Sequence, residues 1–144
     1  MSKEEEIRRA ATILDNQKAQ LESLARQEEL LQYSLEELLR ARETVRNTKK
    51  AGQGAEMLVP VGAGAFLSMN VKDADRALMS IGSDLVVKES VDKVLERLDT
   101  RIKEIEEADK SLSERISDLD SRVRVQARFV QDLYDKTKNE APGA

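Results

Sequence analysis

The stretch that decides the fold runs from Met57 to Glu89 and reads MLVPVGAGAFLSMNVKDADRALMSIGSDLVVKE. It contains β-branched runs and glycine-rich turns, whereas the charged segments on either side contain almost none of this chemistry. Met57 to Val61 and Ala65 to Val71 flank the turn signal Gly62-Ala63-Gly64, which predicts a β-hairpin.

The second half of the stretch repeats the pattern of strand, turn and strand. Leu78 to Ile81 and Leu85 to Lys88 flank Gly82-Ser83-Asp84, so we expect a second hairpin. Hairpins are marginal in water, and these strands carry more apolar surface than two helix ends can cover. We therefore expect residues 55–89 to be an oligomerisation module. The side chains expected at its subunit interface are Leu58, Val59, Val61, Phe66, Leu67, Met69, Val71, Met79, Ile81, Val86 and Val87.

The segment before this module, residues 1–50, predicts a long helix. Ser2 and Glu5 form a capping-box signature, and Lys49 and Lys50 suit a last helical turn. Between them, apolar residues fall on two positions of a heptad repeat, which is typical of a coiled coil. One position holds Ile7, Leu14, Leu21 and Leu35; the other holds Ala10, Leu24, Leu31, Leu38 and Val45.

The segment after the module, residues 90–139, predicts a second coiled-coil helix, followed by a short flexible tail over 140–144. Ser90 is a good N-cap. The heptad positions hold Leu95, Ile102, Ile116, Val123 and Val130, and Val91, Leu98, Ile105, Leu112, Leu119 and Leu133. Because the two helices are nearly equal in length, we expect an α+β fold: a long antiparallel coiled-coil hairpin with two β-hairpins between the helices.

Polar residues interrupt the heptads. Gln17, Arg42 and Gln126 are more typical of register devices than of functional sites. If facing residues have numbers that add to about 139, Glu28 lies close to Asp109, and two acids in one layer should weaken the coil there. We expect a flexible point at this layer unless a neighbouring cation reaches across.

Composition excludes several classes of function. The chain has a formal charge of -4 with interspersed signs, which argues against nucleic-acid binding. It contains no cysteine and no histidine, which removes the usual zinc ligands and the usual general base. Gly62-Ala63-Gly64 lacks the remaining residues of a dinucleotide or P-loop motif. We expect a protein that is not an enzyme, with no catalytic residues, metal site or cofactor.

Targeting signals are also missing from the sequence. The N-terminal residues MSKEEEIRRA contain no apolar core of a signal peptide, and no apolar run reaches about 18 residues. We expect a soluble, cytoplasmic protein that does not bind membranes.

The order of these elements carries a resemblance. A coiled-coil helix, a hairpin opening with Leu58-Val59-Pro60-Val61, a second hairpin containing Ile81-Gly82-Ser83, and a second coiled-coil helix together resemble the α-class subunit of prefoldin, of the archaeal type. β-class subunits of that family have a single hairpin. The resemblance implies a hexamer of two α and four β subunits, in which the hairpins assemble into an intersubunit double β-barrel that carries six coiled-coil tentacles. It also implies a chaperone that holds unfolded proteins without ATP and passes them to a group II chaperonin.

The free end of the coiled coil is the expected client-binding tip. Val125 and Phe129, four residues apart, form a stripe outside the heptad seam, and Tyr134 also lies off it, so we expect these side chains to contact clients. Ile7, Leu14, Val130 and Leu133 could serve equally in the seam. The full set of expected tip residues is Ile7, Ala11, Leu14, Val125, Phe129, Val130, Leu133 and Tyr134.

Two other functions fit the same pattern. The chain could be an architectural coiled-coil subunit of an oligomer or filament that binds no client. It could also be an adaptor whose tip docks one defined partner through a helix face.

Overall fold

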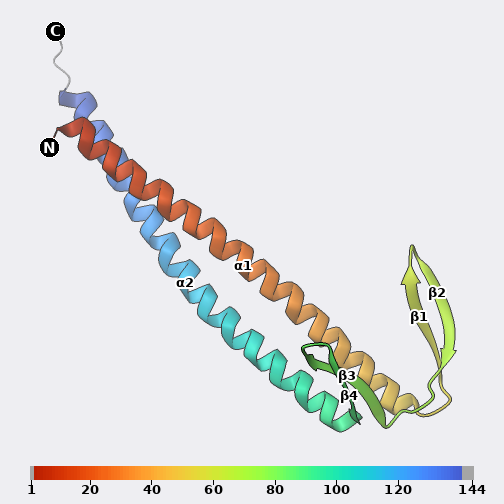
Figure 1. The fold of residues 1–144 in the computed structure, drawn as a ribbon. Coiled ribbons are helices and arrows are strands. Elements are labelled where there is room, and N and C mark those ends of the chain that lie inside the picture. The colour runs from red at the N-terminus through yellow and green to blue at the C-terminus, as the bar shows by residue number, and fades with distance from the viewer. Residues whose placement is uncertain (1, 141–144) are drawn as a thin grey trace. The chain divides into compact units, whose positions relative to one another are not determined.

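The computed structural model describes residues 2–140 and contains two long helices with two antiparallel β-hairpins between them (Figure 1). The expected α+β arrangement is confirmed. The elements are α1 (Lys3–Ala51), β1 (Glu56–Gly62), β2 (Ala65–Asn70), β3 (Arg76–Gly82), β4 (Leu85–Ser90) and α2 (Val91–Glu140). Apart from its first residue, the tail expected over 140–144 lies outside the described residues.

The predicted caps define where both helices begin. The Glu5 N–H donates to Ser2 Oγ at 3.2 Å, and the Lys93 N–H donates to Ser90 Oγ at 3.2 Å. Each hydroxyl satisfies a backbone donor that has no partner within its own helix. Helix α1 ends at Ala51, where Gly52 takes a positive φ of 85°. Glycine adopts this conformation without a Cβ clash, so it stops the helix at this residue.

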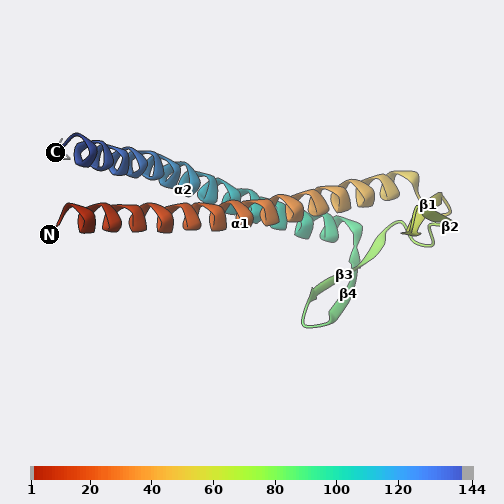
Figure 2. The ribbon, with the colours of Figure 1, turned by 90° about the horizontal axis from the view of Figure 1, so that it is seen from above.

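The chain divides into two compact units, and each contains a part of both helices. The first unit is Met1–Gln32 with Glu107–Ala144. Within it, the first part of α1 runs alongside the last part of α2, as Figures 1 and 2 both show. The Gln126 side-chain amide donates to the Ala10 carbonyl at 2.9 Å. Ala10, Leu24 and Leu112 are the buried residues of its heptad seam.

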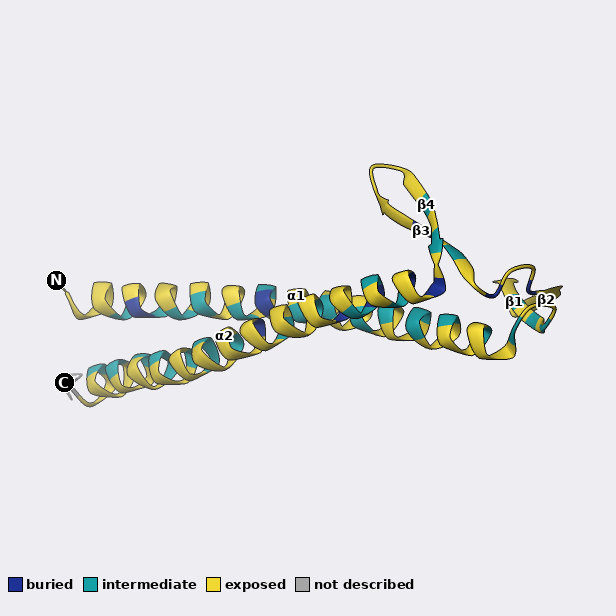
Figure 3. Ribbon diagram, turned by 90° about the horizontal axis from the view of Figure 1, so that it is seen from below, coloured by how far each residue is buried: buried dark blue, intermediate teal, exposed yellow. Residues whose placement is uncertain are grey.

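The second unit, Tyr33–Glu106, contains the remaining parts of the helices and both hairpins. Arg42 of α1 forms an ion pair with Asp99 of α2 at 3.0 Å, and Lys49 forms one with Asp92. The buried helix residues of this unit lie on α2, and Figure 3 shows a dark blue segment where α2 follows β4. They are Val91, Val94, Leu98 and Ile102, of which Val94 lies outside the predicted heptad series. The helices are thus antiparallel in each unit, as predicted.

The two hairpins have the same register. Strands β1 and β2 pair from Glu56↔Asn70 to Gly62↔Ala65, and β3 and β4 pair from Arg76↔Ser90 to Gly82↔Leu85. Each pair forms its own two-stranded sheet. Each ladder also shifts by one residue just before its turn, between Pro60 and Gly62 and between Ser80 and Gly82. Every position of the first hairpin therefore has an equivalent twenty residues later.

Candidate subunit and client interfaces

The equivalence of the hairpins extends to their turns and their closing hydrogen bonds. Val71 donates its N–H to the Ala55 carbonyl at 2.8 Å, and Val91 donates to the Asp75 carbonyl at the same distance. In the turns, Ala63 and Gly64 have φ of 51° and 77°, and their equivalents have 48° and 61°. Two successive positive φ values are the geometry of the tight turn that matches strand twist. This turn conformation is slightly strained in the second hairpin, because Asp84 has a Cβ and occupies the position that Gly64 has in the first.

Both hairpins expose large apolar side chains. In the first, Leu58 is 67% exposed and Phe66 is 59% exposed, and all of β2 is exposed. In the second, Leu78 is 71% exposed and Leu85 is 59% exposed. A folded chain seldom leaves this much contiguous apolar surface in water unless another chain covers it. The hairpins therefore have the character of an association surface.

Apolar packing fastens the second hairpin to the helices. Met79 of β3 lies in a buried cluster with Val94 and Leu98 of α2. Side chains of α1, including Leu38 and Val45, pack against this cluster. Burial of a methionine side chain stabilises by roughly 1.5–3 kcal/mol, so this contact is the main anchor of β3.

Two arginines of α2 add polar clamps to the same hairpin. Arg97 forms a two-pronged interaction with the Glu89 carboxylate of β4, with both N···O distances at 2.7 Å. Arg101 donates to the Ser80 carbonyl of β3 at 3.1 Å. The hydrogen bonds from Arg97 hold the pKa of Glu89 below its ordinary value, and the carboxylate correspondingly raises the pKa of Arg97.

The first hairpin has no such anchors. Across residues 2–140, no hydrogen bond or ion pair joins β1 or β2 to a helix. The positions equivalent to Met79, Ser80 and Glu89 are Val59, Pro60 and Met69. Val59 has a shorter side chain than Met79, and the thioether of Met69 cannot form the ion pair that the Glu89 carboxylate forms. The first hairpin is therefore held to the chain by its backbone connections.

The residues expected at the subunit interface fall into three groups in the structure. Leu58, Val61, Phe66, Leu67, Met69, Ile81 and Val86 are exposed. Val59 and Val87 are half-buried, and Val71 and Met79 are buried within this chain. Sequence reasoning omitted Leu78 and Leu85, which are among the most exposed apolar residues. Their equivalence to Leu58 and Ala65 was visible in the sequence as a spacing of twenty residues.

The residues expected at the tip lie in the first unit. Val125, Phe129 and Tyr134 are exposed, by 71%, 46% and 61%. Phe129 and Leu133 line a shallow groove of about 360 Å³ on α2. The other expected tip residues are half-buried: Ile7, Ala11, Leu14, Val130 and Leu133.

Two exposed apolar residues of the first unit, Ile13 and Leu30, were missed. Ile13 is 43% exposed and lines a shallow surface groove on α1 with Arg9 and Thr12. Its signal was present in the sequence, since position 13 belongs to neither heptad series. An apolar residue outside the seam of a coiled coil has no partner across the helix pair.

The polar heptad residues behave in different ways. Arg42 and Gln126 bond across the helix pair, in keeping with a role in register. Glu28 accepts a hydrogen bond from the Ser113 hydroxyl at 2.7 Å, while Asp109 Oδ1 and Gln17 Oε1 are buried without a partner. Unsatisfied buried acceptors are costly, so Asp109 should weaken the coil locally. The flexible point at this layer stays a prediction.

The described residues contain neither a candidate metal cluster nor a membrane-spanning helix. Among residues 2–140, no group of three or more acidic side chains is placed to hold a metal ion. Within the same residues, neither helix contains a stretch apolar enough to cross a membrane.

Two paired long helices with two exposed apolar β-hairpins between them are typical of a subunit of an oligomeric complex. Comparison with known proteins gives the family: the family model described as Prefoldin subunit matches residues 4–136. The chain belongs to the prefoldin family, which is a family of chaperone subunits that assemble into oligomeric complexes, and the resemblance noted from sequence is confirmed.

Individual relatives agree with this assignment. The chain is 37% identical over 119 residues to prefoldin subunit alpha of Pyrococcus horikoshii, an alignment that covers 82% of this chain and 80% of the relative. It is 28% identical over 139 residues to prefoldin subunit alpha of Methanospirillum hungatei, which covers 96% and 93%. A filamentous prefoldin from Methanocaldococcus jannaschii, solved by cryo-electron microscopy, shares the fold with a TM-score of 0.67 and 23% identity, covering 80% of this chain and 95% of that one.

Proposed function

We propose that the chain is the α-class subunit of an ATP-independent holdase that acts in the cytoplasm. In this proposal, two α and four β subunits assemble through their hairpins into a barrel platform. The tips of the coiled coils capture unfolded proteins and deliver them to a group II chaperonin. The observation that carries the client-binding part is the exposure of Val125, Phe129 and Tyr134 on the last turns of the described α2.

The exposed tip residues suit weak and unselective binding. Val125 and Phe129 lie one helical turn apart and so share a face of α2. A patch of this size binds any exposed apolar segment with low affinity, and several subunits that contact one client raise the total affinity by avidity. Such binding needs neither a shaped pocket nor an energy source.

The apolar hairpin surfaces support the assembly part. Leu58, Phe66 and Leu67 of the first hairpin are all at least half exposed, and so is Leu85 of the second. Strands that pair with strands of other subunits would cover these side chains and also the open edges of both two-stranded sheets. Assembly would thus cover both the exposed apolar side chains and the open sheet edges of the module.

An aggregation assay tests the client site. The complex of this chain with its β-class partner should suppress aggregation of several unrelated denatured proteins, with and without ATP. The triple variant Val125→Ser, Phe129→Ser, Tyr134→Ser should assemble normally and need about fivefold more complex for half-maximal suppression, because the three lost apolar contacts together weaken binding by about 1 kcal/mol.

A matched control separates tip binding from general surface polarity. Leu30 is 66% exposed in the same unit but lies outside the proposed tip, so Leu30→Ser should leave suppression unchanged. Full activity of the triple variant would contradict the tip assignment. A wild-type complex that protects no client would indicate the architectural alternative, and protection of a single protein would indicate the adaptor.

A further inference from the structure

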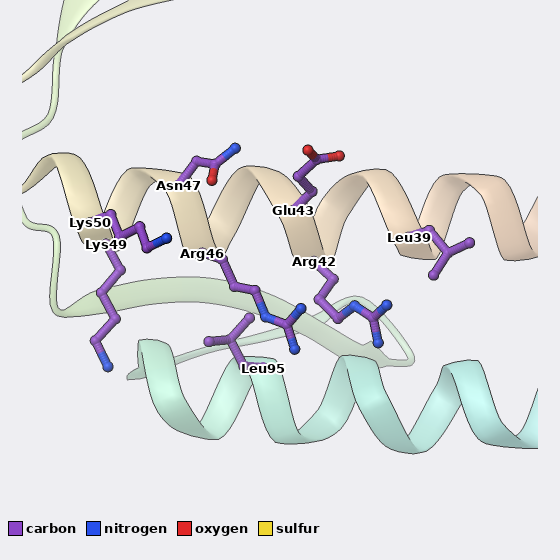
Figure 4. A pocket seen from close by; sticks show the side chains of 8 residues that line it. All are labelled: Leu39, Arg42, Glu43, Arg46, Asn47, Lys49, Lys50 and Leu95. Atoms are coloured by element: carbon purple, nitrogen blue, oxygen red, sulfur yellow. The ribbon is translucent and has the colours of Figure 1, made fainter.

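A basic groove lies between the end of α1 and the start of α2 in the second unit (Figure 4). Its volume is about 700 Å³. Its lining contains four cations of α1, two leucines, and Glu43 and Asn47 of α1. The cations are Arg42, Arg46, Lys49 and Lys50, and the leucines are Leu39 of α1 and Leu95 of α2. We refer to these eight residues as the basic groove. Its charge contrasts with the formal charge of -4 of the whole chain.

Two of the four cations have acidic partners within the chain. Arg42 pairs with Asp99 and Lys49 pairs with Asp92, and successive partners on each helix are seven residues apart. At the level between these bridges, α2 presents Leu95 in place of an acid. Figure 4 shows Arg46 reaching toward α2 beside Leu95, while Glu43 points away from that helix.

The other two cations are without an acidic partner. Within the described part of the chain, neither Arg46 nor Lys50 forms an ion pair. Lys50 lies in the last turn of α1, where the helix dipole favours a cation, but Arg46 lies a full turn earlier and lacks that explanation. Arg46 and Lys50 are therefore the cations available to a ligand on the side that faces α2, because the one lining acid, Glu43, points away from that helix.

The apolar residues of the groove limit which kinds of ligand fit it. Leu39 is 37% exposed and Leu95 is half-buried, so an occupant gains by covering them with an aliphatic side chain. Phosphate sites usually add backbone N–H donors from a glycine-rich loop or a helix N-terminus. This groove is lined mainly by the C-terminal turns of α1, where the free backbone groups are carbonyls. A peptide segment with carboxylates beside aliphatic residues fits better than a small anion.

The position of the groove points to the source of that segment. Lys50 is six residues before β1 begins at Glu56, so the groove adjoins the hairpin module. We propose that the basic groove docks an acidic, aliphatic segment of a neighbouring subunit in the assembled complex. The proposal rests on the assembly part of the proposed function and adds to it a polar contact outside the hairpins.

A charge-reversal variant tests this docking. Arg46→Glu with Lys50→Glu should weaken assembly with the β-class partner at least about tenfold at low salt, because the groove would then repel the partner's carboxylates. The difference from wild type should shrink in about 0.5 M salt, which screens charges beyond roughly 4 Å. Native mass spectrometry over a titration of the partner measures both effects. The neutral variant Arg46→Gln with Lys50→Gln should lie in between.

Arg40→Glu is the matched control, since Arg40 is an exposed cation of the same helix outside the groove. Helix content by circular dichroism checks that all variants fold. If the reversal variant and the Arg40 control assemble equally well, or if wild-type chain does not assemble with the partner, the docking proposal is wrong. If assembly depends on Arg46 and Lys50 while the wild-type complex protects no client, docking stands and the holdase assignment fails.

Inorganic phosphate distinguishes a peptide segment from a small anion. Phosphate at about 10 mM should weaken assembly no more than chloride at equal ionic strength. Saturable phosphate binding to the isolated chain in calorimetry, lost in the reversal variant, would overturn the peptide assignment.

Discussion

The two hairpins share a register, a turn geometry and a closing hydrogen bond, yet they differ in how they are held. The second is fastened to the helices by Met79, by the Glu89–Arg97 ion pair and by the bond from Arg101 to Ser80. In the described part of the chain, the first hairpin forms none of these contacts. The difference shows that turn and register residues set the backbone conformation of a hairpin. Its docking to the helices depends on a few side chains that the turn and register do not determine.

The contrast suggests different tasks for the hairpins. A docked hairpin has a fixed direction before any partner arrives, which lowers the entropy lost on association. A hairpin held only by its connections can adjust to the partner that it meets. Variants that release the second hairpin or alter its turn distinguish the two states, and their expected effects decrease from the buried anchor to the turns.

The largest effect should come from the buried anchor. Met79→Ala should lower the free energy of unfolding of the second unit by about 2–4 kcal/mol, because it leaves a cavity against Val94 and Leu98. The equivalent change in the first hairpin, Val59→Ala, removes a half-buried side chain and should cost about 1 kcal/mol or less. Urea denaturation followed by circular dichroism compares them. Equal losses would mean that both hairpins are docked alike.

A smaller effect is expected from the polar clamp. Arg97→Gln removes the two-pronged interaction with Glu89, so the amides of β3 and β4 should exchange hydrogen several-fold faster, approaching the rates in β1 and β2. Lys103→Gln is a suitable control, because Lys103 is an exposed cation of α2 that forms no ion pair within the described residues. Unchanged hydrogen exchange in β4 would show that the packing of Met79 is enough to hold the second hairpin against the helices.

The clamp should also depend on pH. Because Arg97 lowers the pKa of folded Glu89, the clamp contributes its full stability above the unfolded pKa of about 4.3. That contribution is lost as pH falls from there through the folded pKa. The wild-type chain should therefore melt above Glu89→Gln at pH 7, and the gap should close in strong acid. A gap that persists at about pH 2 would mean that protonation of Glu89 does not release the hairpin.

The smallest effect should come from the turns. Asp84→Gly places a glycine at a φ of 61° and should stabilise the second hairpin by about 0.5 kcal/mol. Gly64→Asp makes the reverse change at the equivalent position and should destabilise the first by a similar amount. Thermal melts of both variants test the equivalence of the turns. Changes of the same sign would contradict it.

Much of this architecture could be predicted from the sequence. The heptads predict both helices, and Ser2 and Ser90 predict their starts because a capping hydroxyl acts within three residues. The glycines at 62, 64 and 82 predict the turns for an equally local reason. Interactions between near neighbours in the chain can be read directly from the residues that make them.

The docking of the second hairpin could not be predicted in the same way. Alternation along β3 cannot say that the face bearing Met79 meets the chain's own helices, and Arg97 looks like any charged coil residue until Glu89 is placed beside it. The acceptor of Arg101 is a backbone carbonyl, which has no sequence signature. The buried oxygens of Gln17 and Asp109 became known as unpaired only when their neighbours were in place.

The spacing of twenty residues between the hairpins also makes them exchangeable parts. Removing residues 56–75 would join Ala55 to Arg76 and leave a single hairpin between the two helices, with its register, its turn and its closing bond to Val91 available from residues that remain. Ala55 would then occupy the place of Asp75, whose contribution to that closing bond is a backbone carbonyl that any residue supplies. A single deletion would thus convert this chain into a single-hairpin form, the form that the resemblance implies for its expected β-class partners.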